Sequence, residues 1–551
     1  MIPRRPAIPV YVAIALNLRR RALVAATAAS PPAAGFRYAR LRSLRLVPRR
    51  SSTAVATLSR RSLFAAPLLL RAQESLPVRH QTVELDTGET VKLKLASGDA
   101  VELTLLAVDE RRDPIRGAMR EPRARVRVNG EEVWLVSGNY RLPAAAGGVQ
   151  IDCPALRGFE QNAALKLWRL GKQARFRLWP QGSPWIEPGT FVLPLRRRWL
   201  STHTQATNEP VYVDGNDHPA ARTIYYHNDV DLGGAEGLEE IHAAAAGLVV
   251  SARNQVLEGY GDSPARPRAD VIYIRDGRGW YYRYSHFQRI DSEIRPGVRV
   301  EAGQRLGWLG KEGGAGWSHL HFGIQARQPS GQWGTEDAWP FLWEAALREQ
   351  RPPVIALARP HRLARVGDEV ELDGSLSWSA AGKPLQYEWT LSNGRRARGA
   401  RVRIRYEQPG SYSEILRVED SRGNAAWDFC VVQVLPRRDL SGSGAPAAAE
   451  DYPPTIHAVS WPTSDLRPGQ QIIFRVCTFR AREAEETWDF GDGSPPVSVR
   501  SRLAPNSLSS AEEYAETSHA FSRPGDYLVR VVGRNRRGET ATAHLWVPVR
   551  S

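Results

Sequence analysis

The chain has 551 residues, too many for a single hydrophobic core, so its length predicts three or four domains. A formal net charge of +16 could indicate a nucleic-acid-binding protein. However, residues 1–73 contain 14 Arg and no Asp, Glu or Lys, and subtracting these charges from +16 leaves +2 for the rest of the chain. The basic charge therefore belongs to an N-terminal leader, and nucleic acid is not expected as a partner.

The leader, residues 1–73, contains the segment SRRSLFAAPLLLRAQ from Ser59 to Gln73. An arginine pair before a short apolar run is typical of an export signal, and the run is too short to cross a bilayer as a helix. The arrangement resembles a twin-arginine signal; a Sec signal and an Arg-rich organellar transit peptide are the alternatives. The leader has no Met after Met1, which suggests an over-extended start and true translation near Leu58. We expect an exported protein of the periplasm, cell envelope or extracellular space, with no transmembrane span in the mature chain.

The sequence pattern of residues 74–200 predicts a small antiparallel β domain. Apolar residues alternate with polar ones from Val83 to Leu105, between Thr-Gly and Ser-Gly turns. Asn129-Gly130 separates two further alternating runs, which predicts a hairpin, and we expect a second hairpin around Gly171. No residues with catalytic potential stand out, so the expected role is to pack on or cover the next domain.

Three cysteines, Cys153, Cys430 and Cys477, are odd in number and far apart, so no disulfide framework is predicted. Cys430 and Cys477 lie in apolar, strand-like runs and are expected to be small core residues. Because no C-x-x-C occurs, a metal site must use histidine and carboxylate ligands.

Residues 201–348 contain an ordered set of histidines. In GWSHLHFGIQ, His319 and His321 are two apart, so they share one face of a strand. In TIYYHNDVDLGG, His227 and Asp231 are four apart, a spacing that brings both to one side of a strand or a helical turn. Together with one histidine of the H-x-H pair they would give Zn²⁺ three ligands and leave a tetrahedral position for water, as in catalytic zinc sites.

A fifth candidate, His286, follows Tyr282 and Tyr284 in GWYYRYSHFQRI. Taken alone it would be read as a surface or core histidine. Short strands punctuated by Pro-Gly and Ala-Gly turns then lead to His319.

The full series is H-x-x-x-D, A-x-x-x-G, Y-x-H, P-G-x-x-V-x-x-G-Q-x-x-G and H-L-H-F, over about Tyr225 to Gln325. It resembles the M23 family of zinc metallopeptidases (lysostaphin- and LytM-like). The resemblance implies one Zn²⁺ per chain and two pocket histidines that do not bind it. The implied ligands are His227, Asp231 and His321, and the implied pocket histidines are His286 and His319.

Zinc lowers the pKa of bound water to about 7 and polarises a carbonyl. A neutral imidazole beside it can accept a proton, and a protonated one can stabilise an oxyanion. The sequence leaves open which of His286 and His319 is the base.

Two departures from the family pattern stand out. Asp229 occupies a position where the family usually has Gly, so it could compete as a ligand, although apolar Leu232 after Asp231 favours Asp231. The loop KEGGAGWS also differs from the commoner Thr-Gly-x-Ser type, which affects the expected specificity more than catalysis. We interpret His242 as structural.

Two similar modules follow, residues 349–436 and 455–551, joined by a Gly/Ser/Ala/Pro-rich linker at 437–454. Each has an aromatic strand that ends in a polar Gly turn, then a Pro-Gly turn, a Tyr and an alternating strand, as in a small β-sandwich. These residues resemble the Ig-like PKD family, most closely at WDFGDGS in the second copy. Asp489 and Asp492 there could bind calcium or, as carboxylates in tight turns more often do, accept hydrogen bonds from backbone N–H groups.

The chain is therefore expected to be multidomain and mainly β: a small antiparallel β domain, an M23 peptidase domain and two β-sandwiches. The leading hypothesis is an exported zinc metalloendopeptidase acting on peptidoglycan cross-links, with extracellular peptides as the other substrate class. The alternatives are a catalytically silent M23 scaffold or regulator of cell-wall hydrolases, and an extracellular binding protein that functions through its PKD domains. Silent members typically lack a ligand or a pocket histidine, whereas all five positions are intact here.

Overall fold

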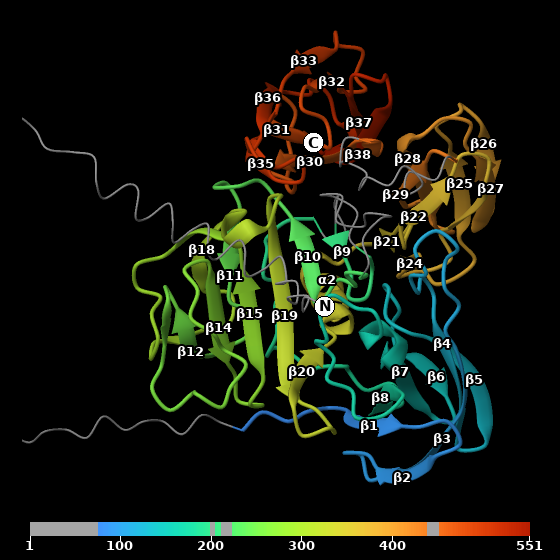
Figure 1. The fold of residues 1–551 in the computed structure, drawn as a ribbon, viewed down its shortest axis with the longest axis vertical. Helices are drawn as coiled ribbons and strands as arrows, with labels where there is room; N and C mark the ends of the chain where they lie inside the picture. The colour runs from blue at the N-terminus through green and yellow to red at the C-terminus, as the bar shows by residue number, and fades with distance from the viewer. Residues whose placement is uncertain (1–74, 199–203, 211–222, 438–450) are drawn as a thin grey trace, which may run out of the picture. The chain divides into compact units, whose positions relative to one another are not determined.

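The computed structural model describes residues 75–198, 204–210, 223–437 and 451–551. The expected leader lies outside the described residues, as does most of the expected linker at 437–454. The described chain is a series of β-sheets, and α2 is the one α-helix in these ranges. The prediction of a mainly β, multidomain protein is thus confirmed (Figure 1). No helix within the described ranges is both long and apolar enough to cross a membrane.

The N-terminal region contains two four-stranded antiparallel sheets. The alternation seen in the sequence sets their buried faces: Val101, Leu103 and Leu105 are buried, whereas Glu102 between them is exposed. The expected hairpin forms at Asn129 and Gly130, whose φ values of 47° and 90° suit a tight two-residue turn. One sheet has the order β2 (Thr90–Lys94), β3 (Ala100–Asp109), β4 (Arg123–Val128), β5 (Glu131–Val136), and the other β1 (Gln81–Leu85), β8 (Ala174–Pro180), β7 (Val149–Leu156), β6 (Ala144–Ala146).

The second expected hairpin, around Gly171, is wrong. Only the later half is a strand, β8, and it pairs with β1 and β7 instead of with the preceding residues. The backbone N–H groups of Gly171 and Lys172 donate to Glu84 Oε2 at 2.6 and 3.1 Å. Trp168 is buried, and its indole N–H donates to Asn208 Oδ1 at 2.7 Å. This segment buries Trp168 and Leu170 in an irregular loop held by side chains, and alternation alone does not distinguish such a loop from a strand.

The histidine-bearing region is built on a nine-stranded sheet with a three-stranded sheet beside it. A single hydrophobic core contains the apolar faces of these strands and the buried aromatic residues of α2. Apolar residues between Ile186 and Leu195, which come before the first strand of this region, also belong to it. The main sheet has the order β13 (Gln255–Val256), β12 (Gly247–Ala252), β14 (Val271–Arg275), β15 (Tyr281–Ser285), β19 (His319–Arg327), β10 (Val230–Gly233), β9 (Thr204–Gln205), with β17 (Arg299–Val300) on β12 and β20 (Trp333–Glu336) on β19; the small sheet has β11 (Glu240–His242), β18 (Arg305–Leu309), β16 (Phe287–Ile290), and α2 is Trp339–Gln350.

The C-terminal half contains two β-sandwiches of similar construction. The aromatic strand of each copy contributes a fully buried indole to its own core, Trp389 in β25 and Trp488 in β32. A short parallel pairing of β28 with β38 joins them into one nine-stranded sheet. Their strands are β21 (Val354–Ile355), β22 (Arg362–Arg365), β23 (Glu369–Asp373), β24 (Trp378–Ser379), β25 (Gln386–Thr390), β26 (Arg396–Arg398), β27 (Arg401–Arg405), β28 (Gly410–Glu419), β29 (Ala425–Leu435), β30 (Thr455–Trp461), β31 (Ile472–Phe479), β32 (Glu485–Asp489), β33 (Val497–Val499), β34 (Arg502–Leu503), β35 (Ala511–Glu513), β36 (Ala515–His519), β37 (Gly525–Arg534) and β38 (Thr540–Val549).

The three cysteines are free and buried, and the burial of Cys430 and Cys477 was expected from the sequence. Cys430 and Cys477 lie in β29 and β31 and belong to apolar clusters.

Candidate metal centre

Strand register brings the H-x-H pair to the H-x-x-x-D segment. β19 lies between β10 and β15 in the sheet (Figure 1), and Asp231 of β10 is directly opposite His321. His227 precedes β10, where its backbone N–H donates to the Glu209 carbonyl at 2.9 Å. Leu232 and Leu320 are also cross-strand partners, and both contribute to the core on the other side of the sheet. The apolar residues of the two strands thus fix which face presents the polar side chains.

Three of these side chains converge on one point. His227 Nε2 lies 2.9 Å from Asp231 Oδ2, and His321 Nδ1 lies 2.9 Å from Asp231 Oδ1. One ligand atom from each residue falls within 4.8 Å of the other two. All three residues are at least 95% buried. Two imidazole nitrogens and a carboxylate oxygen are a donor set that suits Zn²⁺, so these residues fit the metal that the sequence implies.

The histidines around Asp231 keep its side chain ionised. Burial alone would raise the pKa of Asp231, but His227 and His319 beside it outweigh burial and hold the pKa well below its usual range. Asp231 is therefore a carboxylate at neutral pH, the form that ligates a metal.

The remaining two histidines adjoin the same cluster. The ring of His286 lies 4.8 Å from that of His319 and 6.0 Å from that of His321, centroid to centroid. His319 Nε2 is 3.3 Å from Asp231 Oδ2. The structure thus brings all five predicted site residues together.

Each of these two histidines is oriented by a backbone carbonyl. His286 Nδ1 lies 2.7 Å from the Glu312 carbonyl oxygen, and His319 Nδ1 lies 3.0 Å from that of Trp317. Since a carbonyl oxygen only accepts, Nδ1 carries the hydrogen in both rings. In the neutral ring, Nε2 then has the lone pair. Burial lowers the pKa of His286 to about 4, so this ring is neutral at neutral pH.

Several supporting residues were not found by sequence reasoning. The Asp270 carboxylate, just before β14, lies 3.6 Å from His286 Nδ1. The Trp317 indole stacks on the His319 ring, with centroids 4.1 Å apart and planes at 24°. Trp317 stands two residues before His319, so its proximity could have been noticed, whereas nothing in the sequence connects Asp270 or Glu312 to His286.

Asp229, which could have competed as a ligand, lies just outside the strand that carries Asp231. It has a φ of 67°, and β10 begins only at Val230. Its Oδ2 lies 3.3 Å from Nε2 of His321, the ring nitrogen that does not face Asp231.

Two other polar features have local structural partners. The carboxylates of Asp489 and Asp492 accept hydrogen bonds from the N–H groups of Gly491 and Ser494 at 2.9 and 3.0 Å, as expected for carboxylates in tight turns. His242 is buried, with Nε2 3.4 Å from a carboxylate oxygen of Glu240.

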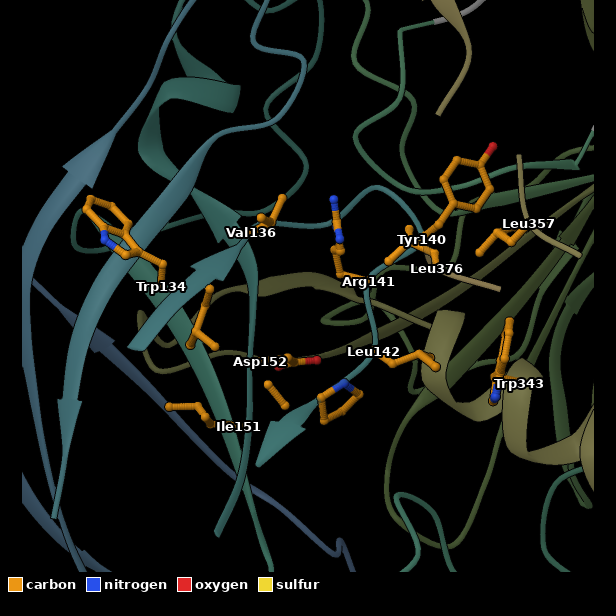
Figure 2. A pocket seen from close by; sticks show the side chains of 13 residues that line it. Trp134, Val136, Tyr140, Arg141, Leu142, Ile151, Asp152, Trp343, Leu357 and Leu376 are labelled. Carbon is orange, nitrogen blue, oxygen red and sulfur yellow. The ribbon is translucent and has the colours of Figure 1, made fainter. Parts of the chain in front are cut away.

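A cavity of about 350 Å³ lies elsewhere in the molecule (Figure 2). Its lining is mostly apolar and includes Trp134, Leu142, Trp343 and Leu357. None of the five predicted site residues lines it. The histidine cluster, and not this cavity, therefore defines the candidate site.

Comparisons with known proteins identify three domains in the chain. Residues 225–332 match the model of peptidase family M23, and residues 350–434 and 459–547 each match a PKD domain. These segments are an M23 peptidase domain and two PKD domains, so the resemblance drawn from the sequence is confirmed.

The individual proteins that resemble this chain share only 20 to 24% sequence identity with it. The chain is 24% identical over 178 residues to the peptidoglycan DD-endopeptidase ShyA of Vibrio cholerae, which covers 31% of this chain and 37% of the length of that relative. Among solved structures, the catalytic domain of lysostaphin from Staphylococcus simulans is 22% identical, with 26% of this chain and 92% of that one covered and a TM-score of 0.18. The catalytic domain of the prophage-encoded M23 protein EnpA from Enterococcus faecalis is 20% identical, with 27% and 92% covered and a TM-score of 0.17. At these TM-scores the two structural likenesses carry no weight.

Proposed function

We propose that the protein is a zinc metalloendopeptidase that binds one Zn²⁺ through His227, Asp231 and His321. The observation that carries the proposal is the convergence of these three buried side chains on one point within an M23 peptidase domain. Three protein ligands leave a tetrahedral position for water, which is the arrangement of catalytic zinc sites.

The bound ion would supply a Lewis acid for the scissile carbonyl and would lower the pKa of water at the site. His286 and His319 would move protons at Nε2, because the Nδ1 hydrogen of each ring is donated to a backbone carbonyl. A neutral ring accepts a proton from the attacking water, and a protonated ring stabilises the oxyanion or protonates the leaving amine.

The proposed substrate class is the peptide part of peptidoglycan. The M23 domain and the relative described as a peptidoglycan DD-endopeptidase support it. Extracellular peptides are the second substrate class, because PKD modules occur on secreted enzymes. Export to the periplasm, cell envelope or exterior belongs to the proposal and rests on the signal-like segment SRRSLFAAPLLL in the leader.

The test is digestion of purified cell walls by the full chain loaded with zinc, with mass spectrometry of the released fragments. We expect new amino termini at one type of peptide bond and one zinc per chain. His321→Ala should lose the zinc, and His319→Ala should keep it without cleaving. Stoichiometric zinc with no cleavage of walls or of protein substrates would favour the silent scaffold, and absence of zinc would favour a PKD-based binding protein.

A further inference from the structure

Asp229 occupies a backbone position that favours glycine. Its φ of 67° is in the left-handed region, which glycine adopts freely and which, among other residues, aspartate and asparagine adopt most readily but at a cost. This explains why the family pattern has glycine there. A carboxylate held at such a position, inside the domain, needs a compensating interaction.

The carboxylate of Asp229 is fully buried against a proposed metal ligand. Its Oδ2 lies 3.3 Å from His321 Nε2, while His321 Nδ1 faces Asp231 Oδ1 at 2.9 Å. The two ring nitrogens are separated by one carbon and point away from each other. Asp229 therefore contacts the edge of the ring opposite the one that faces the proposed metal.

The metal-bound tautomer requires an acceptor at this place. When Nδ1 of His321 ligates a metal, Nε2 carries the ring hydrogen and must donate it. The Asn228 amide nitrogen is also 3.3 Å from Nε2, but it is itself a donor and it donates to Asp229 Oδ2 at 3.2 Å. Asp229 Oδ2 is thus placed to accept both hydrogens.

Gly323 provides the space for this carboxylate. It lies two residues after His321 in β19, so both face the same side of the sheet. A Cβ at position 323 would lie 2.2 Å from Oδ2 and 2.3 Å from Cγ of Asp229. The carboxylate therefore fills the room that a side chain at 323 would occupy.

We propose that Asp229 is a positioning residue that accepts the Nε2 hydrogen of His321 and thereby holds Nδ1 toward the metal. This inference rests on the proposed function. A carboxylate behind a ligating histidine fixes the ring orientation and tautomer and makes the ligand more basic, and its loss typically weakens metal binding 10- to 100-fold.

The experiment measures zinc affinity of the full chain by competition with a chromogenic chelator. Asp229→Gly, which restores the residue of the family pattern, should weaken zinc binding about 10- to 100-fold, and Asp229→Asn, which keeps a neutral acceptor, by less. Asp276→Asn is the matched control. Asp276 is also a buried carboxylate of this domain, bonded to Arg278 and Tyr282, and its replacement should leave the affinity within about two-fold.

A double-mutant cycle tests the placement itself. Gly323→Ala should displace the Asp229 carboxylate and weaken zinc binding about as much as Asp229→Gly does. In the Asp229→Gly background the same alanine meets no carboxylate, so it should have little further effect. Equal effects of Gly323→Ala in both backgrounds would overturn the proposal. Circular dichroism of each variant checks that it is folded.

Cobalt substitution separates a positioning residue from a direct ligand. If Asp229 only orients His321, the visible absorption bands of the Co²⁺-loaded Asp229→Gly variant should keep the wild-type positions and intensities. A change of coordination in that spectrum, or zinc affinity within about two-fold of wild type, would overturn the inference while leaving the proposed function intact. A wild-type chain that binds no zinc would overturn both.

Discussion

At the scale of single residues, hydrogen bonds to backbone carbonyls decide what the two pocket histidines can do. His286 and His319 each use Nδ1 to reach a carbonyl, of Glu312 and Trp317 respectively. These main-chain acceptors, joined at His286 by the Asp270 carboxylate 3.6 Å from Nδ1, hold the rings in place. The proposed acid/base chemistry therefore belongs to Nε2 in both rings.

Replacing either ring by alanine should separate catalysis from metal binding. We expect His286→Ala and His319→Ala each to lower kcat by about 10²- to 10⁴-fold, the usual contribution of a general acid or base, with about one zinc per chain retained. The measurements are cell-wall peptide hydrolysis and metal analysis of the same preparations. Loss of zinc from His319→Ala would contradict the assignment of His319 as a pocket histidine that does not bind the metal. It would indicate instead that His319, which lies beside Asp231, is itself a metal ligand.

The sequence could predict the five reactive side chains but not what orients them. Residue type and spacing were enough to predict His227, Asp231 and the H-x-H pair, because a zinc site requires ligands of these types placed close together. The partners of His286 are a carboxylate 16 residues before it and a carbonyl 26 residues after it. Such contacts follow from strand pairing in three dimensions and leave no periodic pattern in the chain.

At the scale of elements, the loop before β19 connects the site to its surroundings. Ser318 Oγ donates to the Gly234 carbonyl at 2.7 Å, which ties the loop to the end of β10. Trp317 is 1% exposed, and it covers the His319 ring. The loop therefore fixes both where β19 starts and how His319 is oriented.

Trp317→Ala should affect stability and catalysis together. Removing a buried indole costs about 3–5 kcal/mol of unfolding free energy, and the His319 ring loses its stacking partner. We expect a lower midpoint of denaturation and a reduced kcat with zinc still bound. The control is Trp389→Ala, an equally buried indole in the first PKD domain, which should lower stability but not the kcat of the folded fraction.

The elements themselves were predictable where one face of a sheet is buried and the other is not. Alternation identified β3 and the hairpin at Asn129-Gly130 because each rests on a local rule of side-chain direction or turn geometry. The expected hairpin at Gly171 was wrong because long-range hydrogen bonds to the side chains of Glu84 and Asn208 hold that segment as a loop. Local patterns do not contain such bonds.

At the scale of the whole molecule, the second PKD domain contacts the loop before β19. The Tyr514 hydroxyl accepts the Ser318 backbone N–H at 3.1 Å and lies 2.7 Å from His457 Nδ1. The Ala511 N–H donates to the Gly316 carbonyl at 2.8 Å. Trp317 also belongs to an apolar cluster whose other members come from this PKD domain. These partners are about 200 residues apart in the chain, so no sequence pattern predicts the contact.

Tyr514→Phe tests whether this contact supports the site. The phenyl ring keeps the packing, but the hydrogen bonds of the Tyr514 hydroxyl with the Ser318 N–H and with the His457 ring are lost, at a cost of about 1–3 kcal/mol. We expect a lower denaturation midpoint and a several-fold lower kcat at unchanged zinc content. The control is Tyr527→Phe, whose hydroxyl bonds only locally to the Arg523 carbonyl, and it should leave kcat at the wild-type value. Unchanged kcat in Tyr514→Phe would show that the contact is purely structural.

The two PKD domains also meet through a buried histidine. The ring of His544 in β38 stacks on Phe429 of β29, with centroids 5.5 Å apart. Burial, and then the charge of Arg530 on the paired strand, lower the pKa of His544 from 6.5 to about 3. The fold therefore favours the neutral ring. The stability that depends on it is fully present above pH 6.5 and is lost progressively as the pH falls toward 3.

Between pH 7 and pH 5 this single histidine should cost the wild-type chain about 2 kcal/mol of unfolding free energy, by linkage between the two pKa values. His544→Phe cannot take up the proton, so its stability should fall less over the same range, as measured by denaturant unfolding at each pH. Phe429→Leu is the matched control, because it removes the same stacking contact and keeps the titrating ring. Its stability should be lower than wild type by a similar amount at every pH, since desolvation and not stacking lowers the pKa. Parallel pH profiles for wild type and His544→Phe would mean that the PKD junction opens enough in solution to hydrate the ring.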